Sequence, residues 1–363
     1  MDTATLIKEL PYKIPDEVIL ELKSSSDLSD KLKIIREWVH SNNNINHEKR
    51  LRWHQPLLKI AQKKKLLKNE AISLSNIVKI HDRLGQFEKS LTLIKRIQAI
   101  WLELCTNDKK YYHNLIISYC DEAVTLRLQN RLNLALDILY KGYEIIKKNG
   151  IDYEDTLIVL FCDLGVIYEK ILDYPAALNY FNESLSLIRK SKDPSNHTEN
   201  KILCYINIGN IHKASNKLNI ACEKYVKAIN IISKHNNYNQ HYIVSNINLG
   251  ETLVELEQYK KALSIYNNAL EACEKSGSEM DLGFIYLLIA EVYINMNRMS
   301  EYDKFIKKGK KLVEKAGYPN DLIFLNHLLS RNYILKGDFD NGILLLLESV
   351  KICKKYNMDQ HLL

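Results

Sequence analysis

The residues of this sequence that could do chemistry by type and spacing are amides and charges in its second half. Asn207, Asn210 and Lys213 follow one another at intervals of three, and Asn248 and Glu251 repeat that interval 41 residues after Asn207 and Asn210. At this spacing, side chains share one face of a helix. An Asn amide offers both a donor and an acceptor, which matches the polar groups of a peptide backbone.

We therefore predict a polar strip that contacts a peptide or a protein segment. Its members are Asn207, Asn210, Lys213, Asn248, Glu251, Glu291 and Arg331. The alternative is that these asparagines only reflect an Asn-rich chain.

A second candidate is the most basic stretch of the chain, residues 47–70, which has acidic residues only at its ends. Its Lys and Arg side chains beside Trp53 could contact nucleic-acid phosphates or an acidic partner, in a salt-dependent way. The alternative is a helix that packs its leucines inward and leaves its lysines in water. Nucleic acid is the less favoured partner, because no helix-turn-helix signature accompanies the stretch. The basic residues are Lys49, Arg50, Arg52, Lys59, Lys63, Lys64, Lys65 and Lys68.

The sequence carries no signature of catalysis. It has no Walker loop, no GxSxG or HExxH motif and no Gly-rich nucleotide loop. Residues 337–342, GDFDNG, lack the ligand spacing of a calcium loop and are interpreted as a turn between helices. The eleven histidines form no HxxxH pair and the seven cysteines form no CxxC pair. We therefore predict a protein without enzymatic activity, cofactor or metal.

The elements that must position the polar strip are helices, because small residues recur in pairs twelve positions apart. Seven such pairs follow at offsets of 40 to 45 residues, a period typical of stacked helix pairs. The low contents of Pro and Gly, six and twelve residues, also favour long helices joined by short turns. The pairs are Val78 and Ser90, Ala123 and Ala135, Gly165 and Ala177, Gly209 and Ala221, Gly250 and Ala262, Ala290 and Tyr302 (where a Tyr replaces the small residue), and Ser330 and Gly342.

The third unit carries this pattern most clearly. Gly165 and Ala177 are expected where its two helices cross, since a larger side chain would push the axes beyond their usual separation of about 8–10 Å. Pro175 suits the first turn of the second helix, where its missing N–H is harmless. Asp173, just before it, is a candidate N-cap.

The units resemble the tetratricopeptide (TPR) repeat family, whose small residues alternate with aromatic ones. The third unit matches through Gly165, Tyr168, Tyr174, Ala177, Phe181 and Ser184, and the fourth and fifth match as closely. The long period of 40 to 45 residues is similar to that of kinesin light chains and bacterial peptide-sensing regulators. The resemblance implies an all-α fold, a right-handed superhelical solenoid of about seven TPR-like helix pairs with an N-terminal helical cap.

In such a solenoid, the first helices of the pairs line a concave groove. The predicted polar strip resembles the asparagine-lined groove by which peptide-sensing regulators hold short peptides. The fifth position of the units lacks the lysine of a carboxylate clamp, so binding of a chaperone tail is not expected. Phe284 and Phe324 are expected to add an apolar lining, which suits an amphipathic helix or an extended peptide.

We expect residues 1–68 to form an N-terminal helical segment with the basic helix, residues 69–356 to form the repeat array, and residues 357–363 to form a tail. The sequence contains no apolar run of about 18 residues, the length that could cross a membrane, and its N-terminus lacks a signal-peptide pattern. The sequence therefore predicts a cytoplasmic protein that does not insert into membranes.

The predicted function is a scaffold or sensor that holds a protein or peptide in its groove, without catalysis. Two alternatives stay open: the sensory or regulatory N-terminal half of a larger signalling protein, and an electrostatic adaptor that uses the basic helix. The last repeat has no charged capping helix after it, so a homodimer through that repeat is a further expectation.

Overall fold

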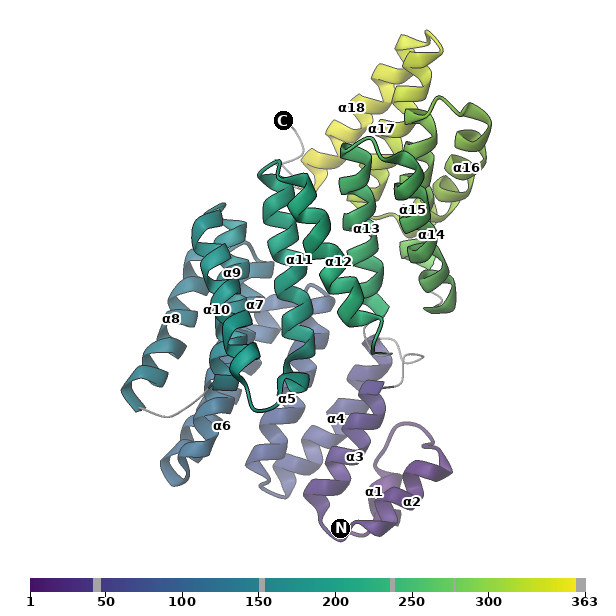
Figure 1. The fold of residues 1–363 in the computed structure, drawn as a ribbon. Helices are drawn as coiled ribbons and strands as arrows, with labels where there is room; N and C mark the ends of the chain where they lie inside the picture. The colour runs from purple at the N-terminus through teal and green to yellow at the C-terminus, as the bar shows by residue number, and fades with distance from the viewer. Residues whose placement is uncertain (42–46, 150–153, 236–238, 277–278, 357–363) are drawn as a thin grey trace. The chain divides into compact units, whose positions relative to one another are not determined.

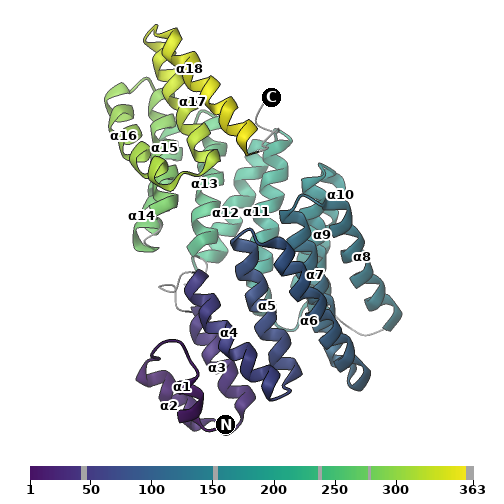
Figure 2. The ribbon, with the colours of Figure 1, turned by 180° about the vertical axis from the view of Figure 1, so that it is seen from behind.

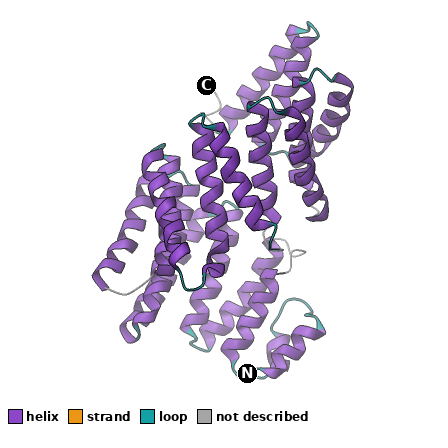
Figure 3. Cartoon of the chain, viewed as in Figure 1, coloured by secondary structure: helices purple, strands orange, loops and turns teal. Residues whose placement is uncertain are grey.

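The computed structural model describes residues 1–41, 47–149, 154–235, 239–276 and 279–356, and the predicted tail 357–363 lies outside them. Within these residues, all regular structure is helical, with eighteen α-helices, two short 3₁₀ helices and no strand (Figure 3). The chain divides into two compact units, residues 1–197 and 198–363. The predicted all-α fold of helix pairs is confirmed.

The first unit holds four N-terminal helices and then three helix pairs (Figure 1). The N-terminal helices are α1 (Thr3–Lys8), α2 (Asp16–Ser24), α3 (Leu28–Ser41) and α4 (His47–Lys63). The pairs are α5 (Leu67–Arg83) with α6 (Phe87–Asn107), α7 (Tyr112–Leu128) with α8 (Leu132–Asn149), and α9 (Glu154–Lys170) with α10 (Tyr174–Lys190).

The second unit consists of four helix pairs, and its last two helices run side by side in both views (Figures 1 and 2). The pairs are α11 (Thr198–Ala214) with α12 (Leu218–Ile232), α13 (Asn239–Glu255) with α14 (Tyr259–Ser276), α15 (Glu279–Asn295) with α16 (Met299–Ala316), and α17 (Pro319–Leu335) with α18 (Phe339–Lys355). The first helix of each of the seven pairs is 17 residues long.

The first N-terminal helix forms where the sequence favours irregular structure. Pro11 and Pro15 predict that residues 1–15 are irregular, but α1 forms before the first proline. Asp2 caps it by accepting a hydrogen bond from the backbone N–H of Thr5 at 2.7 Å. The sequence also predicts two short helices, in DEVILELK and LSDKLKIIREWVH, and these are present as α2 and α3. The buried Arg36 of α3 donates to Asn69 of α5 at 3.0 Å.

The turn inside each helix pair has one repeated geometry. Five positions before the second residue of each twelve-residue pair, one residue takes a left-handed backbone conformation, with φ between 54° and 81°. The backbone N–H of the next residue donates to the carbonyl five residues before it, which satisfies a carbonyl at the end of the first helix. In the third pair, the N–H of Asp173 donates in this way to the carbonyl of Tyr168 at 2.9 Å. The left-handed residues are Gly85, Asn130, Leu172, Asn216, Glu257, Asn297 and Gly337. Asp173 is also the predicted N-cap of α10.

In the three clearest units, glycine is required for a different reason than the sequence predicts. A Cβ added to Gly165 would lie 2.7 Å from the ring of Phe181, and the same atom on Gly250 would lie 2.3 Å from the ring of Tyr266. Both rings are fully buried. The glycine therefore makes room for the flat ring of the partner helix, so it is the ring rather than the distance between the two axes that requires glycine.

Candidate functional site

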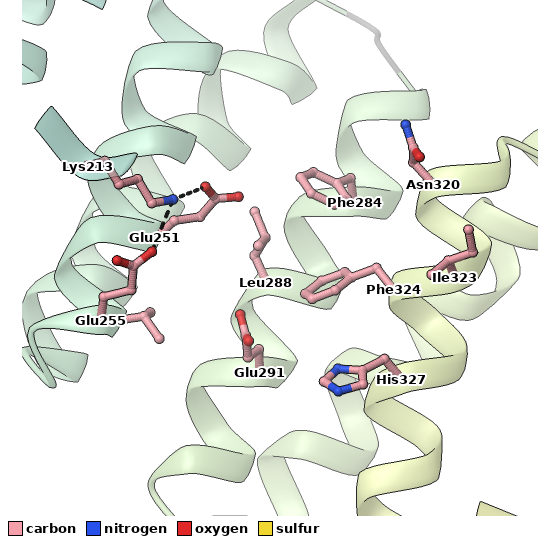
Figure 4. A pocket seen from close by; sticks show the side chains of 11 residues that line it. Lys213, Glu251, Glu255, Phe284, Leu288, Glu291, Asn320, Ile323, Phe324 and His327 are labelled. Carbon is pink, nitrogen blue, oxygen red and sulfur yellow. Dashed lines mark hydrogen bonds and ion pairs between the residues drawn. The ribbon is translucent and has the colours of Figure 1, made fainter. Parts of the chain in front are cut away.

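A cavity of about 460 Å³ lies among the first helices of the four pairs in the second unit (Figure 4). One wall of the cavity carries charges from α11 and α13. The other wall carries apolar and aromatic side chains from α15 and α17, together with Glu291, Asn320 and His327. Its lining residues are Lys213, Glu251, Val254, Glu255, Phe284, Leu288, Glu291, Asn320, Ile323, Phe324 and His327.

The charged wall is organised by Lys213 on α11. Its Nζ lies 2.7 Å from Oε2 of Glu251 and 3.3 Å from Oε1 of Glu255, both on α13 (Figure 4). The two glutamates are four residues apart and therefore stand on the same face of their helix. One ammonium group is thus shared between two carboxylates, and a third carboxylate, that of Glu291 on α15, also lines the cavity.

Burial and charge act in opposite directions on these groups. Burial alone would lower the pKa of Lys213, but Glu251 and Glu255 outweigh it, and the net effect is a raised pKa. Lys213 therefore stays charged at neutral pH. Burial raises the pKa of Glu291, and the negative charge of Glu251 raises it further, while Arg331 and Lys213 partly offset both effects. An added positive charge in the cavity would therefore stabilise the ionised form of Glu291.

The apolar wall is built around two phenylalanines from successive pairs. The rings of Phe284 on α15 and Phe324 on α17 are 5.6 Å apart between centroids, at 53° between planes. Leu288 lies one turn after Phe284, and Ile323 precedes Phe324. Edge-tilted rings at this separation attract one another and form a firm apolar surface. The sequence prediction of an apolar lining by Phe284 and Phe324 agrees with this arrangement.

A buried tyrosine lies behind the charged wall. Tyr266 is fully buried, and its hydroxyl has no hydrogen-bond partner among the described residues. Burial raises its pKa, and the nearby charges of Glu251 and Glu291 raise it further. In the preceding pair, the equivalent Tyr225 donates to Oδ1 of Asn210 at 2.8 Å. The two tyrosines occupy the same place in successive layers, but only Tyr225 has this polar partner.

The structure distributes the seven residues of the predicted polar strip over several environments. Lys213, Glu251 and Glu291 meet at the cavity. Asn248 instead donates to Asn210 at 3.0 Å, so these two amides form a pair beside it. Asn207 is half-buried and Arg331 donates to Asn295, and neither of them lines the cavity.

Sequence reasoning missed several lining residues. Glu255, Asn320, Ile323 and His327 were not proposed as contacts, although they line the cavity. Glu255 could have been found from its position four residues after Glu251, on the same helical face. The other three residues lie on α17. This helix matches the repeat pattern less closely, so the sequence did not predict which of its faces packs toward α15.

The basic stretch forms α4, the turn after it and the first residues of α5, in the first unit. Lys59, Lys63, Lys64, Lys65 and Lys68 are exposed, as are Lys49 and Arg52, whereas Arg50 is half-buried. Trp53 was expected beside the basic side chains on the surface, but it is only 2% exposed and packs edge-on against Trp38 at 5.2 Å. Its ring is therefore part of the core of the N-terminal helices and has no face to stack on a base.

Other kinds of site have no counterpart in the described part of the chain. No cluster of three or more His, Cys, Asp or Glu side chains there is arranged to hold a metal ion. No helix within the described residues is long and apolar enough to span a membrane. What the cavity can do chemically is to recognise a ligand by charge and apolar contact.

Comparisons with known proteins bear on the repeat pattern and the fold. Residues 244–276 match the family model of the tetratricopeptide repeat, and no curated protein matches the sequence. Among solved structures, the chain is similar to a signal transduction ATPase with numerous domains from Pyrococcus horikoshii, PH0952, which has a tetratricopeptide repeat sensor. The TM-score is 0.65 at 16% identity, over 99% of this chain and 53% of that chain.

Two further structures cover similar shares of both chains. The apo form of the quorum sensor NprR from B. thuringiensis has a TM-score of 0.63 at 14% identity, over 93% of this chain and 91% of that chain. A Rap protein in complex with the competence and sporulation factor has a TM-score of 0.57 at 13% identity, over 81% and 79%. These similarities establish the fold. With one matched repeat at residues 244–276 and seven helix pairs of one geometry, the chain has the fold of a tetratricopeptide-type helical-repeat protein.

Proposed function

We propose that this chain is a binding scaffold that holds a peptide or protein segment in the cavity of its second unit. The segment would place an apolar side chain against Phe284 and Phe324, and a positively charged group near Glu255 and Glu291. The observation that carries this proposal is the cavity itself, in which three carboxylates and one ammonium group face an apolar wall. Pockets that bind ligands commonly combine such an apolar lining with a few placed polar groups.

A cationic ligand is favoured over an anionic one by the charges that line the cavity. Lys213 is already shared by Glu251 and Glu255, at 2.7 and 3.3 Å. Glu291 makes no ion pair among the described residues, although Arg331 acts on it from a distance. A Lys or Arg side chain, or a free N-terminal amine, would supply the missing positive charge. An acidic ligand would meet net repulsion.

The names of the similar structures support a sensing role for such a scaffold. One is a tetratricopeptide repeat sensor, one is a quorum sensor, and one was solved with the factor that it binds. On this proposal, the chain senses the presence of its ligand and performs no chemistry on it. The signalling-protein alternative differs only in what would be attached to the scaffold.

The proposal is tested by selecting short peptides from a random display library on the whole protein, and then measuring binding by fluorescence anisotropy. We expect enrichment of peptides that pair Lys or Arg with Leu, Ile or Phe. Replacing Glu291 by Gln should weaken the selected peptides about 10- to 100-fold, since it removes a charge-assisted contact of about 1.5–3 kcal/mol. The matched control, Glu314→Gln, changes an exposed residue of α16 outside the cavity.

Enrichment of acidic peptides, or equal binding by Glu291→Gln and the wild type, would contradict the proposal. The pH dependence gives a second readout. Because burial raises the pKa of Glu291, this carboxyl group ionises at a higher pH than an exposed glutamate does. Binding of a basic peptide should therefore tighten as the pH rises through the pKa of Glu291, and this change should be lost in Glu291→Gln.

A second candidate function uses the exposed lysines that follow the middle of α4. Lys59, Lys63, Lys64, Lys65 and Lys68 stand within ten residues of one another and face solvent. Such a cluster attracts acidic partners or phosphates. Reversing Lys63, Lys64 and Lys65 to Glu should abolish retention on heparin at low salt if this surface acts, and should leave peptide binding in the cavity unchanged.

A further inference from the structure

Exposed apolar side chains are concentrated at the last helix pair. Ten of the twenty-two exposed large apolar residues in the described part of the chain lie between residues 333 and 356. Five of them recur on one face of α18, at intervals that place them in a single stripe. They are Phe339, Ile343, Leu346, Leu347 and Val350, exposed by 60, 53, 39, 52 and 37%.

The stripe is left over after α18 has packed in its own pair. The neighbouring face of α18, with Gly342, Ser349 and Cys353, is buried, and the Ser330 hydroxyl of α17 donates to the Gly342 carbonyl at 2.8 Å. The helix is therefore held in place, and the stripe lies beside the contact that holds it.

An earlier helix pair shows what covers the equivalent positions of its second helix. Ala262 of α14 occupies the position of Gly342, which makes Leu263 and Leu270 the equivalents of Ile343 and Val350. Both leucines are packed into a core that includes Leu288 of the next helix, α15. At Ile343 and Val350, the stripe of α18 therefore corresponds to a surface that the next helix covers in an earlier pair.

The area of the stripe is large for a surface left in water. With about 150–250 Å² for a large side chain, the five residues expose on the order of 400 Å² of apolar surface. The exposed Ile334, Leu335 and Leu344 flank the stripe. With them, the face approaches the roughly 800 Å² that each partner contributes to a stable interface.

The charges of α18 indicate which partner fits. Asp338 and Asp340 stand at its N-terminal end, and Lys351, Lys354 and Lys355 stand toward its C-terminal end. A second α18 that runs in the opposite direction places each acidic end beside a basic end. We propose that a second copy of this chain covers the stripe, through an antiparallel contact between the two α18 helices about a two-fold axis.

The position of the stripe fixes the register of this contact. With the axis between Leu346 and Leu347, each Ile343 meets Val350 of the second copy. Phe339 then lies beside the stem of Lys354 of the second copy, and Asp340 lies within reach of the same ammonium group. Every apolar residue of the stripe is covered, and the charged ends are paired twice because the contact is symmetric.

The test is the mass of the whole protein by light scattering after size exclusion, and by sedimentation, from about 1 to about 100 µM. We expect twice the mass of one chain for the wild type, and the mass of one chain for the double variant Ile343→Glu with Leu347→Glu. The matched control is Leu102→Glu with Leu134→Glu, which changes exposed leucines of α6 and α8. Circular dichroism should be unchanged in both double variants.

Charge reversal tests the direction of the helices. Asp340→Lys or Lys354→Glu alone should weaken the dimer about fivefold, and the two together should restore it, because the reversed charges again attract. A wild type that stays monomeric at about 100 µM would overturn the proposal and leave the face to a different chain. A dimer that survives Ile343→Glu with Leu347→Glu, or that the control pair also dissociates, would overturn it as well.

Discussion

Replacing Gly250 by alanine tests whether the ring of Tyr266 is what requires glycine in the repeat. The new Cβ would lie 2.3 Å from a ring carbon, more than 1 Å closer than an ordinary van der Waals contact. Tyr266 is fully buried, so the ring has no free space to enter. Overpacking of this kind costs up to about 3 kcal/mol, while alanine gains about 1 kcal/mol over glycine in a helix. We expect a net loss of about 2 kcal/mol.

Gly142→Ala provides the control, with the opposite sign. Its Cβ would lie 3.2 Å from Cδ1 of Leu160 and 3.4 Å from Cγ2 of Ile116, and both are methyl groups that can shift by a few tenths of an ångström. The helix gain should therefore dominate, with a net stabilisation of about 0.5–1 kcal/mol.

Urea unfolding measures both changes. All three tryptophans, at positions 38, 53 and 101, lie in the first unit with Gly142, so their fluorescence follows that unit, and circular dichroism follows the whole chain. Shifts of the same sign for the two variants would refute the reasoning. So would a Tyr266→Leu change that fails to recover the stability lost in Gly250→Ala.

Two further predictions concern buried polar groups. Tyr225→Phe should cost about 0.5–1.5 kcal/mol because it removes the donor to Asn210, whereas Tyr266→Phe should be neutral or stabilising because that hydroxyl has no partner; unfolding free energies of the two variants at one pH decide this. Burial raises the pKa of Asp163 to about 7, above its unfolded value near 3.8, so the native state should lose stability as the pH rises from about 4 to about 7 and then level off. Asp163→Asn should remove that slope and stabilise the protein by about 4 kcal/mol at pH 8 but not at pH 4, and parallel melting curves across this range would contradict the assignment.

The helix pairs could be predicted from sequence because small residues recur at the positions where the two helices of each pair pack closely. Gly165 and Ala177 mark a crossing that recurs in every layer, and a fixed spacing of twelve residues leaves one helix–turn–helix geometry. The left-handed residue of each turn was not predicted, since five of the seven positions hold residues other than glycine, among them Leu172 and Glu257. There, the neighbouring helices impose the backbone conformation against the preference of the side chain.

The candidate site could be predicted only in part, because a helical face does not reveal which polar groups are already satisfied. Asn210 and Asn248 stand on the predicted face, but a tyrosine hydroxyl from the second helix of the pair reaches the first of them, and the two amides bond to each other. Whether a tyrosine hydroxyl reaches an asparagine differs from one layer to the next, and residue spacing alone does not predict it. Lys213 and Glu251 could be identified because they are 38 residues apart, close to one repeat, so their side chains meet at equivalent positions of adjacent layers.

The repeated turn inside each pair also determines what a ligand in the cavity would contact. All seven turns share one hydrogen-bonded geometry, so every pair presents its first helix in the same way. The cavity touches α11, α13, α15 and α17, which are the first helices of the four pairs of the second unit. A ligand there would therefore contact all four pairs at once, and its binding would oppose any change in the curvature of that unit.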